Sequence, residues 1–595
     1  MKESKILFLM LLFKAFLNAI NPFVAMYFMG ELINGLYLRK NSEYIFKQVC
    51  LLSILMLLID VICQFIGFYE KISIQRTSYQ QSKKLLEKAL RLNYQKLESV
   101  EVQELLENIK QSKFQRGDVF SKEIEYTETL LIGIFIIISS MVYIGRFVKE
   151  KIEYGVNLWH FILLLVCFIL LVIITISITI YNGMQHNNYV YKRFADVGSI
   201  NRRFGFYRKS IFQNFKYGKE IRIFDESNLI EDEFGKISKD INNFFRSVGK
   251  QESIFRLINI LSNIFIKGLA YIYIGYNSFI HIISVGDVVV YSGAIAQLFA
   301  GIIQIIEAIT NLKGNEKFLE QYFKFWDLSE TEKQKGHTIN QEWVDIVFEN
   351  VYFKHPNANA WILENVCFHI SNMEHVAMVG LNGSGKTTCV RLLLRLYRPD
   401  SGKILLNGKD IWEYNLAEYW KFMSVVFQDF KLFSFSLKQN LLGNKDENAA
   451  IWQVLNEMGM KEKTENMYDG IESCVYKEYD GKGVMISGGE APKIAVCKAL
   501  YKNTPMFIMD EPTAALDPLS ESQLYEKVNT MMKDKTILYI SHRLSSCCFC
   551  DKIIVWKDGR IIETGTHSEL LKENGEYRRL WDAQSEYYRM EDLLI

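Results

Sequence analysis

Six long apolar segments in the first 310 residues constrain this chain more than any other feature of its sequence. A helix that crosses the roughly 30 Å hydrocarbon layer of a membrane needs about 20 mostly apolar residues. The fourth segment is the clearest, because no Asp, Glu, Lys or Arg occurs from Tyr154 to Tyr191. One such run fits a buried helix of a soluble protein, but six predict a membrane domain. The expected spans are approximately Ile6–Leu36, Val49–Phe68, Thr129–Arg146, Leu158–Tyr181, Ile254–Tyr276 and Ile282–Ile306.

The connections between these segments differ greatly in length. About 60 residues separate the second and third segments, and about 70 separate the fourth and fifth. Both long connections have the pattern of charged amphipathic helices and are rich in Lys and Arg, which places them in the cytoplasm. We therefore expect an α-helical transmembrane domain over residues 1–320, with six helices, two long cytoplasmic extensions and a cytoplasmic N-terminus in the cell membrane.

Three charged residues, Lys14, Asp60 and Lys267, interrupt the apolar segments. Charges inside a membrane are costly, so they usually face a polar cavity or one another. One interpretation is a contact with a transported substrate or an Asp60–Lys267 ion pair. The alternative is that the side chains reach the membrane boundary, and the sequence leaves both open.

The remainder of the chain has the mixed pattern of a soluble α/β domain. We expect a linker over residues 321–339 and this domain over residues 340–595. The formal net charge of the whole chain is only +1, so bulk electrostatics give no reason to expect a nucleic-acid partner.

A phosphate-binding loop follows the apolar strand predicted at 375–379. The pattern G-x-x-x-x-G-K-[ST] lies between this strand and an apolar-periodic helix, which is its required context. Its glycines let backbone N–H groups surround phosphates, and the helix N-terminus adds a positive dipole end. Lys386 should neutralise the β and γ phosphates, and the Thr387 hydroxyl should coordinate Mg²⁺. The loop consists of Gly380, Leu381, Asn382, Gly383, Ser384, Gly385, Lys386, Thr387 and Thr388.

A second apolar strand, at 506–509, ends in Asp510 and Glu511. Apolar residues that run into an acidic pair are typical of a buried parallel strand that presents carboxylates at its C-terminal edge. Asp510 suits a contact with Mg²⁺, and Glu511 suits a general base for an attacking water. After a phosphate loop, this pair strongly indicates a nucleotide-hydrolysing domain.

Four further motifs occur in the order found in one known family. The segment Ile486, Ser487, Gly488, Gly489, Glu490 resembles Leu-Ser-Gly-Gly-Gln, the signature of the ABC transporter family. The family's Q-loop, D-loop and H-loop match Gln428, the stretch 514–517 and His542. The resemblance covers the whole soluble half, and the six-helix pattern is similar to the exporter type, in which one chain fuses a membrane domain to an ATP-binding domain.

The resemblance implies a dimer with two shared ATP sites. ATP on one phosphate loop would meet Ser487, Gly488 and Gly489 of the partner chain. His542 would contact the γ-phosphate, and Gln428 would sense this phosphate and Mg²⁺. Catalysis would then rest on Glu511, His542 and Lys386, while Thr387, Gln428 and Asp510 would hold the metal.

The sequence departs from the family pattern at several positions. The signature has Ile486 and Glu490 in place of Leu and Gln, followed by Pro492 and Lys493. His355 stands where the family has a Tyr that stacks on adenine, so ATP binding is expected to be weaker. No catalytic group is lost, so we expect a homodimer with two competent sites, although one half of a heterodimer remains an alternative.

The cargo is less well defined than the ATP site. The stretch 219–224 is similar to the second cytoplasmic loop of bacterial peptide and lantibiotic exporters, which favours a peptide substrate. A lipid or multidrug exporter, or an ABC ATPase that gates a channel or signals to a partner, are the alternatives. Short helices that contact the ATP-binding domain are expected near Leu97–Ile109 and Phe224–Phe234.

Overall fold

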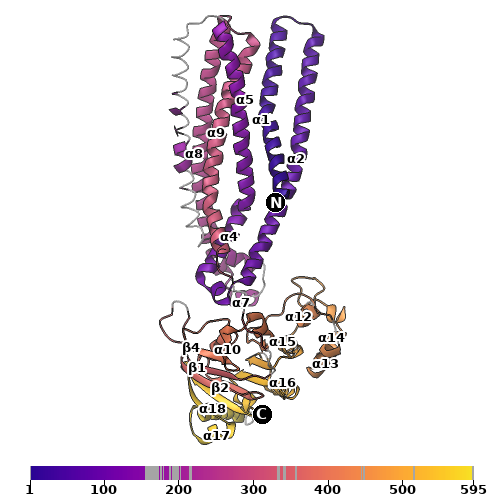
Figure 1. Cartoon of the computed structure of the whole chain (residues 1–595), viewed down its shortest axis with the longest axis vertical. Coiled ribbons are helices and arrows are strands. Elements are labelled where there is room, and N and C mark those ends of the chain that lie inside the picture. The colour runs from indigo at the N-terminus through magenta and orange to yellow at the C-terminus, as the bar shows by residue number, and fades with distance from the viewer. Residues whose placement is uncertain are drawn as a thin grey trace. The chain divides into compact units, whose positions relative to one another are not determined.

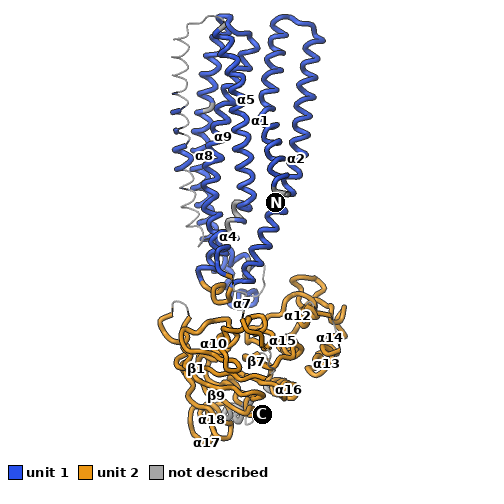
Figure 2. The backbone as a smooth tube through the Cα atoms, in the orientation of Figure 1, with its two compact units in different colours: residues 1–92, 100–329 blue, residues 93–99, 330–595 orange. Residues whose placement is uncertain are grey.

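The chain forms two compact units in the computed structural model (Figure 2). The membrane unit comprises residues 1–92 and 100–329, and the α/β unit comprises residues 93–99 and 330–595. The structure describes residues 2–591 except 154–169, scattered positions between 171 and 202, and 213–216, 331–335, 340–342, 356–357, 444, 447–448 and 513–515. Most of the expected fourth span and the first residues of the D-loop motif therefore fall outside the described residues.

Long helices make up the described part of the membrane unit, and they run side by side in Figure 1. Five of them are long and apolar enough to cross a membrane. They contain four of the other five expected spans and all but the first three residues of the last, Ile282–Ile306. Their bounds are α1 Lys2–Tyr37, α2 Ser42–Arg91, α5 Val119–Glu153, α8 Ser227–Phe279 and α9 Val285–Trp326. The remaining elements are α4 Val100–Arg116, the π-helix Tyr207–Phe212 and α7 Gly218–Ile223.

Helix α9 is the central packing element of this unit. Of its most apolar window, 44% is buried against protein, compared with 6% for the window of α2. Close backbone approach occurs where α9 crosses α1: a Cβ atom on Gly286 would lie 2.1 Å from the carbonyl oxygen of Gly30. Small residues at helix crossings are the usual means of packing in membranes, where lipid removes the hydrophobic drive between helices.

Two sheets form the centre of the α/β unit. The first is antiparallel, in the order β2-β1-β4-β5, and the second has the order β10-β9-β3-β8-β7-β6, with parallel pairing from β9 to β6. The strands are β1 Ile346–Phe353, β2 Leu363–Ile370, β3 His375–Gly380, β4 Ser401–Leu406, β5 Lys409–Asp410, β6 Met423–Val426, β7 Met506–Asp510, β8 Thr536–Ser541, β9 Lys552–Lys557 and β10 Arg560–Gly565. The helices are α3 Tyr94–Glu98, α10 Lys386–Leu393, α11 Leu416–Lys421, α12 Leu437–Leu442, α13 Ala449–Glu457, α14 Lys461–Glu465, α15 Glu490–Tyr501, α16 Pro518–Met531, α17 His567–Lys572 and α18 Glu576–Glu591.

The parallel strands of the second sheet determine where the functional side chains meet. Every residue of β3, β7 and β8 is buried, as the continuous apolar runs predict for a sheet covered on both faces. Because parallel strands end at the same edge, the loops after β3, β6, β7 and β8 are neighbours there. These loops carry the phosphate loop, Gln428, Glu511 and His542.

Short helices of the two extensions lie next to the stretches at which short helices are expected. The first is α3, because Asn93 Oδ1 accepts a hydrogen bond from the Gln95 N–H (2.9 Å) and starts the helix there. The expected Leu97–Ile109 instead runs into α4. The second is α7, which ends before a turn at Asp225 (φ 52°). Most of the expected Phe224–Phe234 is the beginning of α8.

Candidate functional site

The loop between β3 and α10 curves as a phosphate-binding loop requires. Gly385 has a φ of 106°, a region that side chains disfavour, and a Cβ there would lie 2.6 Å from Leu363 Cδ2. Glycine is therefore the residue that fits at this turn. The Ser384 hydroxyl is buried without a hydrogen-bond partner among the described residues, so it remains available to an oxygen of a phosphate.

Lys386 is folded back onto the loop. Its Nζ donates hydrogen bonds to the carbonyl oxygens of Gly380 (2.8 Å) and Leu381 (3.1 Å). The side chain is almost fully buried, and burial lowers the pKa of the ammonium group while the charges of Glu511 and Asp510 oppose the shift. A desolvated lysine held only by carbonyl oxygens has much to gain from a phosphate.

Thr387 and Asp510 form a fitting place for a divalent cation. The Thr387 hydroxyl donates to Asp510 Oδ1 (3.2 Å), while Asp510 Oδ2 is buried without a partner among the described residues. Burial raises the pKa of Asp510 to about 6. An orphaned carboxylate oxygen beside a hydroxyl matches the oxygen ligands that Mg²⁺ prefers, and the ion when bound would neutralise phosphate charge.

Glu511, Gln428 and His542 meet at the edge of the same loop. Gln428 Nε2 donates to Glu511 Oε2 (3.2 Å), and His542 Nδ1 lies 3.3 Å from the same oxygen. Burial disfavours ionisation of Glu511, but the hydrogen bond and charge of His542 outweigh it and lower the pKa of the carboxyl group. Glu511 is thus ionised at neutral pH, as a proton acceptor must be.

A cavity of about 510 Å³ joins these groups. It is lined by Ile362, the phosphate loop from Asn382 to Thr388, Gln428 and Glu511. The signature residues Ser487, Gly488 and Gly489 do not line it. Ser487 and Gly488 are exposed to solvent instead.

His355 also lies outside the lining of this cavity. Its ring meets that of Tyr397 edge to face, with centroids 5.6 Å apart, and contacts Phe353 in the same way. Tyr397 in turn contacts helix α3: its hydroxyl donates to the Glu98 carboxylate, and its ring lies 6.1 Å from that of Tyr94. Within the α/β unit, a continuous set of contacts therefore connects α3 to the expected adenine-stacking position.

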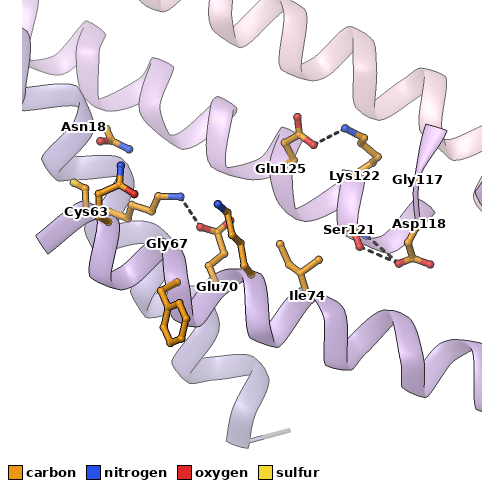
Figure 3. Close-up of a pocket in the computed structure, with 14 residues that line it drawn as sticks. Asn18, Cys63, Gly67, Glu70, Ile74, Gly117, Asp118, Ser121, Lys122 and Glu125 are labelled. Atoms are coloured by element: carbon orange, nitrogen blue, oxygen red, sulfur yellow. Dashed lines mark hydrogen bonds and ion pairs between the residues drawn. The ribbon is translucent and has the colours of Figure 1, made fainter. Parts of the chain in front are cut away.

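A second candidate site lies in the membrane unit. A pocket of about 780 Å³ is lined by residues of α1, α2 and α5, and Figure 3 shows Glu70 and Lys122 on helices at its opposite sides. The Lys14 ammonium lies 2.5 Å from a Glu70 oxygen and 2.8 Å from a Glu128 oxygen. Lys14 thus joins three helices through two carboxylates.

The structure does not support the Asp60–Lys267 ion pair, one of the alternatives that the sequence leaves open. Among the residues that the structure describes, Asp60 accepts a hydrogen bond from Asn21 Nδ2 (3.4 Å), and Lys267 is exposed on α8. No sequence motif indicates Tyr397 or the two carboxylates that bind Lys14. Glu70 and Glu128 stand at the ends of apolar runs, where a charge is ordinary, and only the rotation of each helix reveals that they face Lys14.

Comparisons with known proteins identify the family. The sequence profile of the family described as "ABC transporter" matches residues 363–514. The subtilin transport ATP-binding protein SpaT of Bacillus subtilis is 26% identical over 591 residues, which cover 97% of this chain and 92% of SpaT. The ATP-dependent lipid A-core flippase of Salmonella typhimurium is 31% identical over 411 residues, covering 66% of this chain and 68% of the flippase. Several other curated relatives align over only 47% to 52% of their own length.

The fold agrees as well. A solved structure, titled as a bacterial Atm1-family ABC exporter with ATP bound, superposes with a TM-score of 0.74 at 19% identity and covers 98% of both chains. The membrane helices, the phosphate loop and these relatives lead to one conclusion: the chain belongs to the ABC transporter family, as an ATP-driven exporter that fuses its membrane and ATP-binding domains in one polypeptide.

Proposed function

We propose that two copies of this chain form two shared ATP sites and use them to export a peptide from the cytoplasm. The observation that carries the ATPase half of the proposal is that Gln428 and Glu511 line the phosphate-loop cavity, while His542 contacts Glu511. Residues 1–320 would act as the membrane domain, 321–339 as the linker and 340–595 as the ATP-binding domain, with the N-terminus in the cytoplasm and the cell membrane as the location.

The residues at the cavity have different roles in ATP hydrolysis. Lys386 exchanges its two carbonyl oxygens for the β and γ phosphates, while loop N–H groups from Gly380 to Thr388 hold the phosphate oxygens. Thr387, Asp510 and Gln428 would hold Mg²⁺. Glu511 accepts the proton of the attacking water, and His542 contacts the γ-phosphate as negative charge moves onto the leaving oxygen.

The dimer explains why the signature segment lies outside the cavity of its own chain. Exposed Ser487 and Gly488 are free to meet ATP bound by the second copy, and N–H groups at the start of α15 suit the γ-phosphate. His355 would stack on the adenine. A homodimer is sufficient, since this chain has a carboxylate at 511 and the Ser-Gly-Gly of the signature.

The extension that ends at α7 provides a test of the dimer. Ile223 and Phe224 are exposed beside the turn at Asp225, and the α/β unit exposes an aromatic cluster of Phe433, Phe435 and Tyr479. Apolar groups on the two surfaces suit contact between copies. We expect Asp225→Cys in one copy to crosslink with Ser434→Cys in another, in a chain without native cysteines and with a Cα separation of about 4–7 Å.

Two differently tagged copies distinguish the possible results of this experiment. A mixed dimer with one cysteine in each copy should crosslink, and Asp240→Cys, further along α8, serves as the matched control. Crosslinks that form only within one chain would contradict the exchanged arrangement. If no crosslink forms, either between copies or within one chain, the result would argue against this docking surface.

A peptide is favoured as cargo because SpaT, named as a subtilin transport protein, matches the chain over nearly its full length. Proteoliposomes with outward-facing ATPase domains, incubated with ATP and a mixed peptide library, should accumulate particular peptides in the lumen. The same vesicles with Glu511→Gln should not.

Lipid is the second candidate, because the lipid A-core flippase also matches. A fluorescent lipid in the same vesicles reports its movement between leaflets. ATP-dependent lipid movement without accumulation of any peptide would replace the peptide proposal with this one. ATP-dependent efflux of drugs alone would favour a multidrug exporter.

A further inference from the structure

The acidic residue that ends the signature segment, Glu490, has a dedicated partner in Lys463. The Lys463 ammonium contacts both carboxylate oxygens of Glu490, each at 2.5 Å. Both side chains are partly shielded, with 34% of Lys463 and 25% of Glu490 exposed. A lysine that contacts both oxygens cancels the charge of the carboxylate where it stands.

Glu490 also holds the serine that precedes it. Its Oε2 accepts a hydrogen bond from the Ser487 N–H (2.9 Å), while the Glu490 N–H donates to Ser487 Oγ (3.3 Å). This reciprocal arrangement has the form of a capping box and fixes both the backbone and the hydroxyl of Ser487 at the start of α15. The hydrogen bonds and charge of Lys463 and Ser487 overcome the effect of burial and keep the pKa of Glu490 below its ordinary value.

The helix that carries Lys463 is packed against the hydrophobic core. Lys463 lies on the short helix α14, between the buried residues Met460 and Met467. These two methionines belong to the same hydrophobic core as Ile486, which directly precedes Ser487. Lys463 and Ser487 are therefore held by one core, although 24 residues separate them in the sequence.

The charge balance of the pair matters for ATP. A carboxylate in the first turn stabilises a helix through its dipole, but an unbalanced negative charge there opposes the approach of a γ-phosphate. We propose that Lys463 and Glu490 form a charge-balanced pair that positions Ser487 for ATP bound by a second copy without repelling its γ-phosphate. This inference rests on the proposed shared ATP site, and Lys463 acts in it as a positioning residue.

Substitutions of the two partners should have opposite effects on the KM for ATP. Lys463→Met leaves an unbalanced carboxylate and should raise KM about three- to fivefold, with kcat changed little. Glu490→Gln keeps a side chain that can accept the Ser487 N–H but frees the positive charge of Lys463, so KM should fall about twofold. The double variant restores a neutral pair and should return close to the wild-type KM.

A purely structural role would give another pattern. In that case both single variants would raise KM or lower thermal stability, and the double variant would be at least as impaired. Lys463→Arg, which keeps the charge, should rescue KM. Lys461→Met is the matched control on the same helix, because Lys461 pairs with Glu465 (3.9 Å) and that pair is exposed. This variant should leave KM unchanged.

The measurement uses the full chain in lipid nanodiscs, with ATPase rates over a range of ATP concentrations. A parallel series in the Glu511→Gln background records the ATP concentration needed to close the dimer, so the result does not depend on turnover. An unchanged KM in Lys463→Met would overturn the inference. So would an equal rise in KM when Lys463→Met is made in the wild-type chain and in the Glu490→Gln variant. Failure of Glu511→Gln to stop hydrolysis would instead overturn the proposed ATP site.

Discussion

The two units bury the same kinds of apolar side chain in different ways. Strand β3 of the α/β unit has no exposed residue, whereas only 6% of the most apolar window of α2 is buried against protein. Protein atoms surround the first, and lipid or a second copy must surround the second. In the α/β unit, backbone loops at one sheet edge define the site, so motifs reveal it. In the membrane unit, the site depends on which face each helix presents, which motifs do not encode.

The largest effect is expected in the α/β unit, where Glu511→Gln should lower ATPase turnover. The amide cannot accept the proton of the attacking water, so ATPase turnover should fall about 100-fold or more. ATP binding should be retained, because Lys386 and the loop N–H groups are untouched. Steady-state turnover and binding of a fluorescent ATP analogue measure the two quantities, and turnover within a few-fold of wild type would remove Glu511 from its role.

Lys386→Ala should act on binding itself. A desolvated ammonium that contacts phosphate is worth about 1.5–3 kcal/mol, so the affinity for ATP should fall about 10- to 150-fold. Equilibrium binding of nucleotide measures this loss, and Lys403→Ala, an exposed position on β4, is a suitable control. Unchanged affinity and turnover would show that the phosphate loop does not bind ATP as proposed.

Lys14→Met removes a lysine from the membrane unit, as Lys386→Ala does from the α/β unit. It leaves Glu70 and Glu128 facing each other without a cation, which should cost roughly 2–3 kcal/mol of stability, less than for a fully buried pair because 17% of the Lys14 side chain is exposed. In a chain whose other native cysteines are replaced, a thiol-reactive dye follows thermal unfolding through Cys63, which lines the same pocket.

Glu125→Gln is the control for this variant. It breaks the exposed Lys122–Glu125 pair at the rim of the pocket and should cost less than about 1 kcal/mol. Equal effects of the two substitutions would mean that the Lys14 cluster is no more important than a surface ion pair. The ion pairs at the pocket of the membrane unit would then contribute no more to its stability than surface ion pairs do.

His355→Tyr should have the smallest effect. A larger ring at the proposed adenine position should strengthen ATP binding by about 0.5–1.5 kcal/mol, measured by titration calorimetry. The contact of His355 with Tyr397 supports the aromatic surface on which this gain depends. Weaker binding would indicate that His355 donates a specific hydrogen bond to the nucleotide instead.

Sequence patterns were sufficient for the α/β unit because its chemistry is local. The strand, loop and helix around Lys386 are contiguous, and the burial of β7 delivers Asp510 and Glu511 as the apolar run predicts. The same reasoning located five of the six expected spans at membrane-length helices. The remaining span, the fourth, lies mostly outside the described residues.

Sequence patterns do not predict which side chains from distant segments contact one another. The partners of Lys14 depend on the rotation of α2 and α5, and hydropathy does not specify a rotation. Lys463 is one of many lysines on the surface, and only packing of α14 beside the signature brings it to Glu490. A side-chain cap at Asn93 and a turn at Asp225, which charge and composition do not specify, decide where the short helices α3 and α7 lie.

The length of α2 has a mechanical consequence. Its 50 residues span about 75 Å, so roughly 45 Å of uninterrupted helix must project beyond the hydrocarbon layer. The helix contains no proline, so it behaves as a stiff rod. If the membrane-embedded part acts as a fulcrum, a tilt of about 5° swings the far end by about 4 Å. A small rotation of the membrane-embedded part therefore moves the far end of α2 by about the length of a side chain, and no proline kink within the helix reduces this movement.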